Sequence, residues 1–200
     1  MFSLERWARQ HLAPMFDPLI ALLARTKVSP DLLTALGMAL NVVAGALIAL
    51  GEPFWGGVVM TLLAMPLDVL DGGVARKRGV RSTFGTFLDS TVDRVAEGAI
   101  LGGVAVLFAQ RQMVVGVALA FAALIGSYLV SYTRARAEGL GLDCTVGVFG
   151  RLGRFVVLAL GLLAASVFPE ALLIMVALLT LFSFYTTGER VVHVYRLTRL

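Results

Sequence analysis

Apolar runs without a charged residue alternate with short charged segments along most of the chain. The run from Leu32 to Leu50 follows Ser29 and Pro30, a favourable helix start because serine caps the first amide groups and proline suits the first turn. Crossing a bilayer takes about 20 apolar residues. The pattern predicts an all-α integral membrane protein with six transmembrane helices. The five further runs occupy 53–67, 98–110, 112–133, 155–169 and 171–188, and the first two of these are long enough only if flanking polar residues enter the membrane.

The N-terminal region has a different pattern. Apolar residues at 4, 7, 8 and 12 are interleaved with Arg6 and Arg9, which is typical of a short helix that lies in the membrane interface. A disordered terminus is the alternative. We expect an N-terminal interfacial segment over 1–28, within a single transmembrane domain that covers 1–200.

Composition and the placement of basic residues strengthen the membrane interpretation. Hydrophobic residues make up 58% of the chain and charged residues only 15%, whereas soluble domains have about 25% charged residues. These values exclude an ordinary cytosolic enzyme and a disordered chain. Basic residues gather in 1–31, 76–83, 134–154 and 189–200, and the opposite loops contain only Arg111. Because basic loops stay on the cytoplasmic side, we expect both termini to be cytoplasmic, in a multi-pass protein of the plasma membrane.

Small residues are frequent in the predicted spans. The 21 glycines are typical of helices that pack closely in a membrane. Gly98 and Gly102, four residues apart, are expected to contribute to such packing. The only cysteine, Cys144, cannot form an intramolecular disulfide.

Four aspartates interrupt the apolar pattern where the second and third predicted helices meet the cytoplasmic side. Asp68 and Asp71 are three residues apart, and Asp89 and Asp93 are four apart, so each pair lies on one helical face. The helical rise places both pairs about 22–30 Å from the outer ends of their antiparallel helices. Carboxylates held this close repel one another, and a divalent cation would remove the conflict. Oxygen ligands select a hard ion such as Mg²⁺, Mn²⁺ or Ca²⁺, and four aspartates can hold two ions.

Ion pairs with Arg76 and Arg94 are the structural alternative, although they would account for only one or two aspartates. A cation channel or transporter, or a lipid-binding scaffold without catalysis, could also keep acidic residues in a membrane. Neither gives a reason for the glycine and arginine spacing around the aspartates.

The aspartates belong to a longer motif, Asp-x2-Asp-Gly-x2-Ala-Arg-x8-Gly-x3-Asp-x3-Asp. Through it the chain resembles the CDP-alcohol phosphotransferase family. The resemblance implies a membrane enzyme, usually a homodimer, that transfers a substituted phosphate from a CDP-alcohol to an acceptor hydroxyl and releases CMP. We expect no nucleic-acid partner. The motif positions are Asp68, Asp71, Gly72, Ala75, Arg76, Gly85, Asp89 and Asp93.

The same resemblance assigns roles to individual residues. Asp93 is the expected general base and also a ligand of a second ion, Mg²⁺ or Mn²⁺. The metal ligands implied are Asp68, Asp71, Asp89 and Asp93. The expected CDP-binding residues are Asp68, Gly72, Ala75, Arg76, Thr83, Gly85 and Thr34, with CDP-diacylglycerol as the donor.

A cluster of arginines in the cytoplasmic segments suggests a phosphorylated acceptor, since guanidinium groups match phosphate in bidentate geometry. The residues are Arg134, Arg136, Arg151, Arg154 and Arg190. The alternatives are the positive-inside bias and contacts with lipid headgroups. The string 131–138 resembles prokaryotic phosphatidylinositol phosphate synthases, which implies inositol 1-phosphate as acceptor. That subfamily usually has two glutamates where this chain has Gly150 and Gly153, so glycerol 3-phosphate stays open as the alternative.

Overall fold

The computed structural model describes residues 13–80 and 82–199, and helices are the only regular elements in these residues. This confirms the all-α prediction. The chain divides into two compact units, 1–103 and 104–200, with one long helix running from the first into the second. The helices are α2 (Ala13–Ala24), α3 (Pro30–Ala49), α4 (Pro53–Val58), the π-helix η1 (Val59–Ala64), α5 (Met65–Arg78), α6 (Thr83–Gln110), α7 (Val114–Glu138), α8 (Arg151–Ala164) and α9 (Pro169–Thr198).

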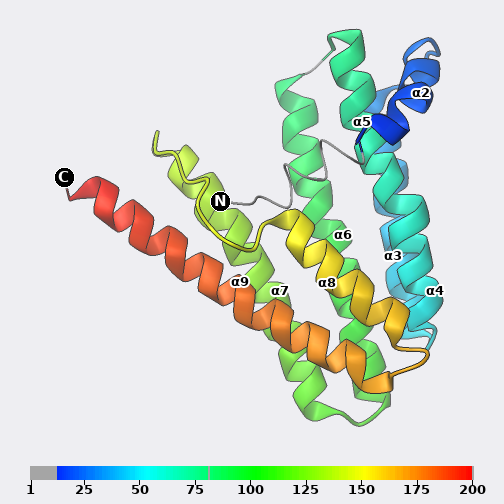
Figure 1. Cartoon of the computed structure of the whole chain (residues 1–200), viewed down its shortest axis with the longest axis vertical. Helices are drawn as coiled ribbons and strands as arrows, with labels where there is room; N and C mark the ends of the chain where they lie inside the picture. The colour runs from blue at the N-terminus through cyan, green and yellow to red at the C-terminus, as the bar shows by residue number, and fades with distance from the viewer. Residues whose placement is uncertain (1–12, 81, 200) are drawn as a thin grey trace. The chain divides into compact units, whose positions relative to one another are not determined.

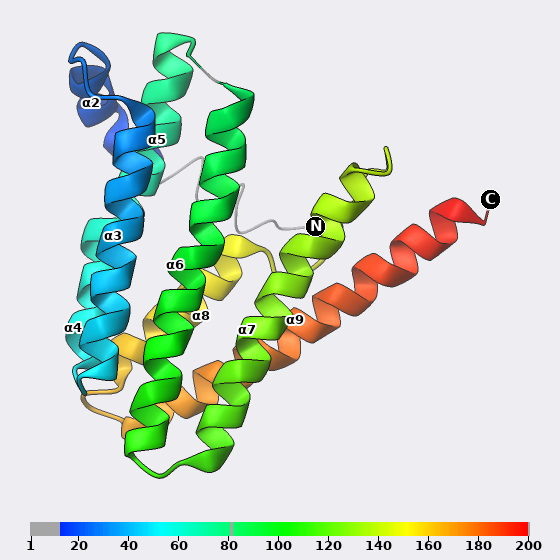
Figure 2. The ribbon, with the colours of Figure 1, turned by 180° about the vertical axis from the view of Figure 1, so that it is seen from behind.

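In the first unit, α3 lies beside the continuous rod formed by α4, η1 and α5 (Figures 1 and 2). The predicted start of α3 is confirmed, because the Ser29 hydroxyl accepts a hydrogen bond of 3.2 Å from the Leu32 amide and Pro30 is the first helical residue. The predicted helix pattern at 4–12 lies outside the described residues. Within 1–28 the structure places α2, which packs against α5.

One turn of the α4–α5 rod is π-helical, which the hydrophobic pattern did not predict. Pro66 lies two residues after the end of this turn. A proline ring clashes with the carbonyl four residues earlier and supplies no amide hydrogen. That carbonyl belongs to Leu62, inside η1. The wider turn therefore accommodates the proline just before the first two aspartates.

Glycines allow α3 to approach α6 closely. A Cβ atom built on Gly103 would overlap the carbonyl oxygen of Gly45, and one built on Gly45 would overlap the carbonyl of Ala99. The expected contact at Gly102 was wrong: no described atom lies within 4 Å of a Cβ built there, and Gly102 is exposed. The α6 residues that approach α3 are therefore Ala99 and Gly103, each one position beyond the predicted glycines.

In the second unit, α7 and α8 both pack against α9. A ladder of hydrogen bonds attaches the α7–α8 connection to α9. The Phe149 amide donates to the Thr186 hydroxyl and the Val148 amide to the Glu189 carboxylate, each at 3.2 Å. Arg190 continues the ladder by donating to the Val146 carbonyl at 3.0 Å. The connection that leads into α8 therefore has a fixed course.

Four helical segments are long and apolar enough to cross a membrane among the residues described, which is the character of a membrane protein. They are Pro30–Ala49, Pro53–Arg78, Val114–Glu138 and Glu170–Thr198. The predicted count of six also requires α6, which carries several charged residues, and α8, which has only 14 residues.

Candidate active site

Helices α5 and α6 bring three of the four motif aspartates together. Asp68, Asp71 and Asp89 each offer a carboxylate oxygen, and these three oxygens lie within 4.8 Å of one another. Asp71 is 6% exposed, and the other two are half-buried. Three converging carboxylate oxygens are a ligand set for a hard divalent cation, so the residues present fit the metal that the motif implies.

The Asp71 carboxylate is oriented by two neighbours. The Thr34 hydroxyl of α3 lies 2.5 Å from Oδ2, and the Gly72 amide donates to Oδ1. The same hydroxyl also lies 3.2 Å from the Pro30 carbonyl within α3. Each carboxylate oxygen has a further lone pair, so these contacts leave Asp71 able to bind a cation. Thr34, expected at the nucleotide, therefore contacts a predicted metal ligand directly.

Asp93 lies one turn beyond Asp89 on α6 and is not part of the three-carboxylate cluster. Its Oδ2 atom is 3.7 Å from Nη1 of Arg94. This Nη1 atom also donates a hydrogen bond to the Ser90 carbonyl. The ion pair that sequence reasoning offered as an alternative thus involves Asp93.

Apart from Thr34 of α3, the expected nucleotide residues lie on α5 and in the first turn of α6. Gly72, Ala75 and Arg76 occupy α5, which ends at Arg78 and is capped by Gly79 in a left-handed conformation with φ of 67°. A Cβ atom on Gly72 would lie 3.3 Å from the Arg76 guanidinium. A side chain at Gly72 would therefore crowd the Arg76 guanidinium.

At the start of α6, which begins at Thr83, the Gly85 amide donates to the Ser82 hydroxyl at 2.8 Å. A Cβ atom on Gly85 would lie 3.5 Å from Oδ1 of Asp31. Asp31 is an acidic group near the site that sequence reasoning missed. Its only signal was its place in the first turn of α3, where an acidic residue is ordinary because it favours the helix dipole.

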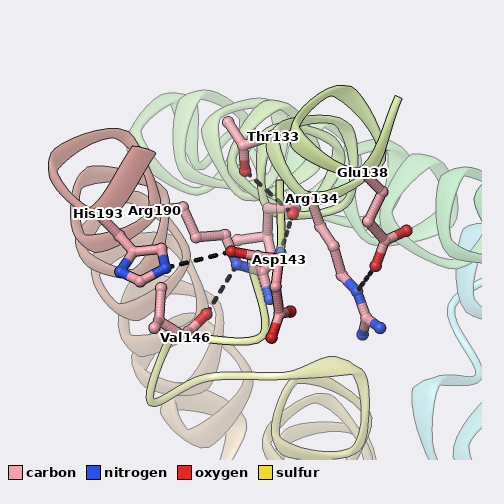
Figure 3. Close-up of polar contacts among 8 residues, drawn as sticks. Thr133, Arg134, Glu138, Asp143, Val146, Arg190 and His193 are labelled. Atoms are coloured by element: carbon pink, nitrogen blue, oxygen red, sulfur yellow. Dashed lines mark hydrogen bonds and ion pairs between the residues drawn. The ribbon is translucent and has the colours of Figure 1, made fainter. Parts of the chain in front are cut away.

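The five arginines expected to bind the acceptor all belong to the second unit, where their environments differ. Arg136 and Arg151 are exposed, whereas Arg154 and Arg190 are 4% and 6% exposed. Exposed Arg134 forms a 2.8 Å ion pair with Glu138, one turn further along α7 (Figure 3).

Arg190 has a structural role that the sequence did not indicate. Two of its nitrogens donate to the carbonyls of Val130 and Val146, and Figure 3 shows the contact with Val146. His193, one turn further along α9, lies 3.2 Å from the Asp143 carbonyl. Arg190 thereby joins α7, the α7–α8 connection and α9.

Comparisons with known proteins agree with the motif. The family model of CDP-alcohol phosphatidyltransferases matches residues 27–185. The phosphatidylinositol phosphate synthase of Streptomyces avermitilis is 44% identical over 158 residues, which are 77% of this chain and 64% of that protein, just under two thirds of its length.

Two solved structures of Mycobacterium tuberculosis phosphatidylinositol phosphate synthase match with 31% identity and a TM-score of 0.81. One holds bound CDP-DAG, and the match covers 89% of this chain and 92% of that one. The other is a complex with manganese and citrate, and the match covers 89% of this chain and 88% of that one. With the family model matching most of its length, the chain belongs to the CDP-alcohol phosphatidyltransferase family.

Proposed function

We propose that this protein transfers the phosphatidyl group of CDP-diacylglycerol to the hydroxyl of inositol 1-phosphate and releases CMP, as a step of phospholipid synthesis. The observation that carries the proposal is the convergence of the Asp68, Asp71 and Asp89 oxygens within 4.8 Å, on a motif found in a family whose relatives include named phosphatidylinositol phosphate synthases.

Most side chains of α5 and α6 at the site bind the metal or the nucleotide, and one accepts a proton. Asp68, Asp71 and Asp89 would hold a divalent ion, Mg²⁺ or Mn²⁺, with Asp93 contributing to a second. Such ions polarise phosphoryl oxygens and stabilise a leaving phosphate. Arg76 binds a phosphate oxygen of the nucleotide through its guanidinium. Gly72, Ala75, Thr83, Gly85 and Thr34 border the CDP pocket, where small side chains let the nucleotide approach the backbone.

Asp93 acts as the general base. A carboxylate close to the site but outside the cluster of three can accept the proton of the acceptor hydroxyl. The hydroxyl oxygen then forms a bond to the lipid-bearing phosphorus while the bond from that phosphorus to CMP breaks. The proton passes to Asp93, and the lipid chains stay in the membrane.

The arginines of the second unit bind the phosphate of the acceptor. Buried Arg154 is the strongest candidate, because a desolvated guanidinium interacts more strongly with phosphate than an exposed one. Arg190 has two nitrogens on backbone carbonyls, so it both shapes and lines the pocket. Arg134, Arg136 and Arg151 complete the set.

Glycerol 3-phosphate is the second candidate acceptor. A Cβ atom on Gly153 would lie 3.0 Å from the Phe149 ring, so this chain has little room for the glutamate expected there in inositol phosphate enzymes. The same arginines would suit the phosphate of either acceptor.

For the membrane arrangement we propose six spans, with α6 and α8 completing the four long apolar segments, in a single domain over 1–200. The 1–28 segment lies at the interface. Both termini and the site face the cytoplasm at the plasma membrane, and the protein acts as a homodimer.

The experiment that tests the function is CMP release by the purified protein with CDP-diacylglycerol and Mg²⁺. Inositol 1-phosphate, glycerol 3-phosphate, serine and inositol are supplied in parallel. We expect release with inositol 1-phosphate and none with inositol. Release only with glycerol 3-phosphate would select the second acceptor, and release with none of the four would refute the proposed reaction.

We predict that Thr34→Val weakens divalent-ion binding about 10-fold, because groups that orient metal ligands contribute 10–100-fold to affinity. Valine has the shape of threonine but cannot donate to Asp71. The Mn²⁺ concentration for half-maximal CMP release measures the effect. Thr34→Ser is the matched control, since it keeps the hydroxyl, and an equal loss in both variants would contradict the role of the hydrogen bond.

We also predict that Arg154→Ala raises the KM for the phosphorylated acceptor about 10–100-fold, the loss expected for a hydrogen bond to a charged group. The KM for CDP-diacylglycerol should change far less. Initial rates at varied acceptor and donor concentrations measure both. Exposed Arg111→Ala serves as the control for lost positive charge, and equal effects on the two KM values would contradict an acceptor-phosphate pocket.

A further inference from the structure

A single side chain at the end of α5 joins this helix to α2. The guanidinium of Arg78 donates to the carbonyls of Leu23 and Val28 at 2.6 Å, to Ala24 at 3.1 Å and also to Thr26. The last carbonyls of a helix have no partner within that helix. The planar guanidinium, with its fixed fork of N–H groups, can satisfy several at once. Arg78 thus binds the end of α2 and the link to α3.

Apolar packing continues this contact along α5. Leu70, Val74 and Arg78 recur every four residues and therefore share one face of the helix. Buried Ile20 of α2 packs with Leu70 and Val74 in one hydrophobic cluster. A Cβ atom on Gly73 would lie only 2.5 Å from the Ile20 side chain. The two helices are therefore in close contact over about two and a half turns of α5.

Together with the packing of α3 on α5, the contact with α2 restricts how α5 can rotate about its own axis. Asp68 and Asp71 lie on a neighbouring face of the same helix, while Asp89 belongs to α6. Each residue along an α-helix turns the direction of the side chain by about 100°. A modest rotation of α5 would consequently move two carboxylates of the cluster away from the third.

We propose that Arg78 is a positioning residue for the aspartate cluster. By attaching α5 to the end of α2, it holds Asp68 and Asp71 at the separation from Asp89 that a divalent ion requires. The inference rests on the proposed function, since it takes the cluster to be a metal site. It assigns Arg78 no contact with substrate or metal.

The test is Mn²⁺ binding by the purified full chain, followed by electron paramagnetic resonance without substrate. We expect Arg78→Met to weaken Mn²⁺ binding about 10-fold and to change the line shape of the bound ion. Arg78→Lys should not restore the affinity, because one ammonium group cannot reproduce the fork of the guanidinium. The matched control is Lys77→Met, which removes one positive charge from an exposed neighbouring position.

A second variant separates positioning from simple loss of stability. Ile20→Ala loosens the same helix contact from the α2 side, so we expect it to weaken Mn²⁺ binding as well. Combined with Arg78→Met, its effect should be smaller than the product of the two single effects, because both changes act on one contact. If Arg78→Met does not fold, Arg78→Lys and Ile20→Ala carry the test.

Three results would overturn the inference. Unchanged Mn²⁺ affinity in folded Arg78 variants would refute the positioning role and leave the proposed function intact, even if thermal stability fell. An equal loss in Lys77→Met would assign the effect to charge. Failure of the unmodified protein to bind Mn²⁺ would refute the metal site itself, and the proposed function with it.

Discussion

Asp93→Asn is expected to reduce CMP release about 1,000-fold, within the range attributed to a positioned general base, while metal-dependent binding of CDP-diacylglycerol persists. The amide has almost the shape of the carboxylate but cannot accept the proton of the acceptor hydroxyl. Because Asp93 lies outside the cluster of Asp68, Asp71 and Asp89, donor binding should survive the change. Rates of CMP release and a direct binding measurement with Mn²⁺ test the two parts separately.

Asp71→Asn provides the contrast for this experiment. Asparagine removes a negative charge from the cluster, so we expect this variant to lose metal-dependent donor binding together with turnover. Asp17→Asn, on the exposed surface of α2, controls for loss of an acidic group elsewhere. Normal turnover in Asp93→Asn would remove this residue from the mechanism. Loss of donor binding in the same variant would show that donor binding needs the second ion, to which Asp93 is proposed to contribute.

The second large effect is on stability. Gly103→Ala is expected to lower the free energy of unfolding by about 1–3 kcal/mol, the usual cost of adding atoms to a packed contact. The new methyl group would overlap the carbonyl oxygen of Gly45. Backbone atoms cannot move aside as a flexible side chain can, so α3 and α6 would have to separate. Thermal unfolding in detergent measures the change.

Gly102→Ala is a matched control for this prediction. It makes the same chemical change on the same helix, one residue away, where no described atom lies within 4 Å of the added carbon. Alanine favours a helix over glycine by about 0.8–1 kcal/mol, so this variant should be as stable as the parent or slightly more stable. A similar loss in both variants would show that the close approach of α3 to α6 does not limit stability.

Local features of the sequence predicted much of the first unit. Ser29 and Pro30 correctly marked the start of α3, because capping depends on residues next to one another in the chain. Helical periodicity put Asp68 and Asp71 on one face, and the similar depth of Asp89 on the following antiparallel helix indicated a shared site. The structure brings these three carboxylates together, while the roles of Asp93 and of the arginines stay predictions.

Contacts between distant positions could not be read from the pattern. Arg78 was counted as one more basic residue on the cytoplasmic side, yet its partners lie some 50 positions earlier in the chain. Thr34 resembled a nucleotide residue, and only the packing of α3 on α5 brings its hydroxyl to Asp71. The spacing of small residues did not predict that Gly103, rather than Gly102, contacts α3, because the contact face depends on how α6 is rotated.

The π-helical turn at Val59–Ala64 limits where the chain can change in length. A π turn contains about one residue more than an α turn, so deleting one residue there would leave a regular helix whose later side chains keep their directions. A deletion between Met65 and Asp68 would instead turn both aspartates of α5 by about 100° relative to the preceding helix. One residue can therefore be lost from η1 without turning the carboxylates, although a regular α-turn there would bring back the clash between the Pro66 ring and the preceding turn.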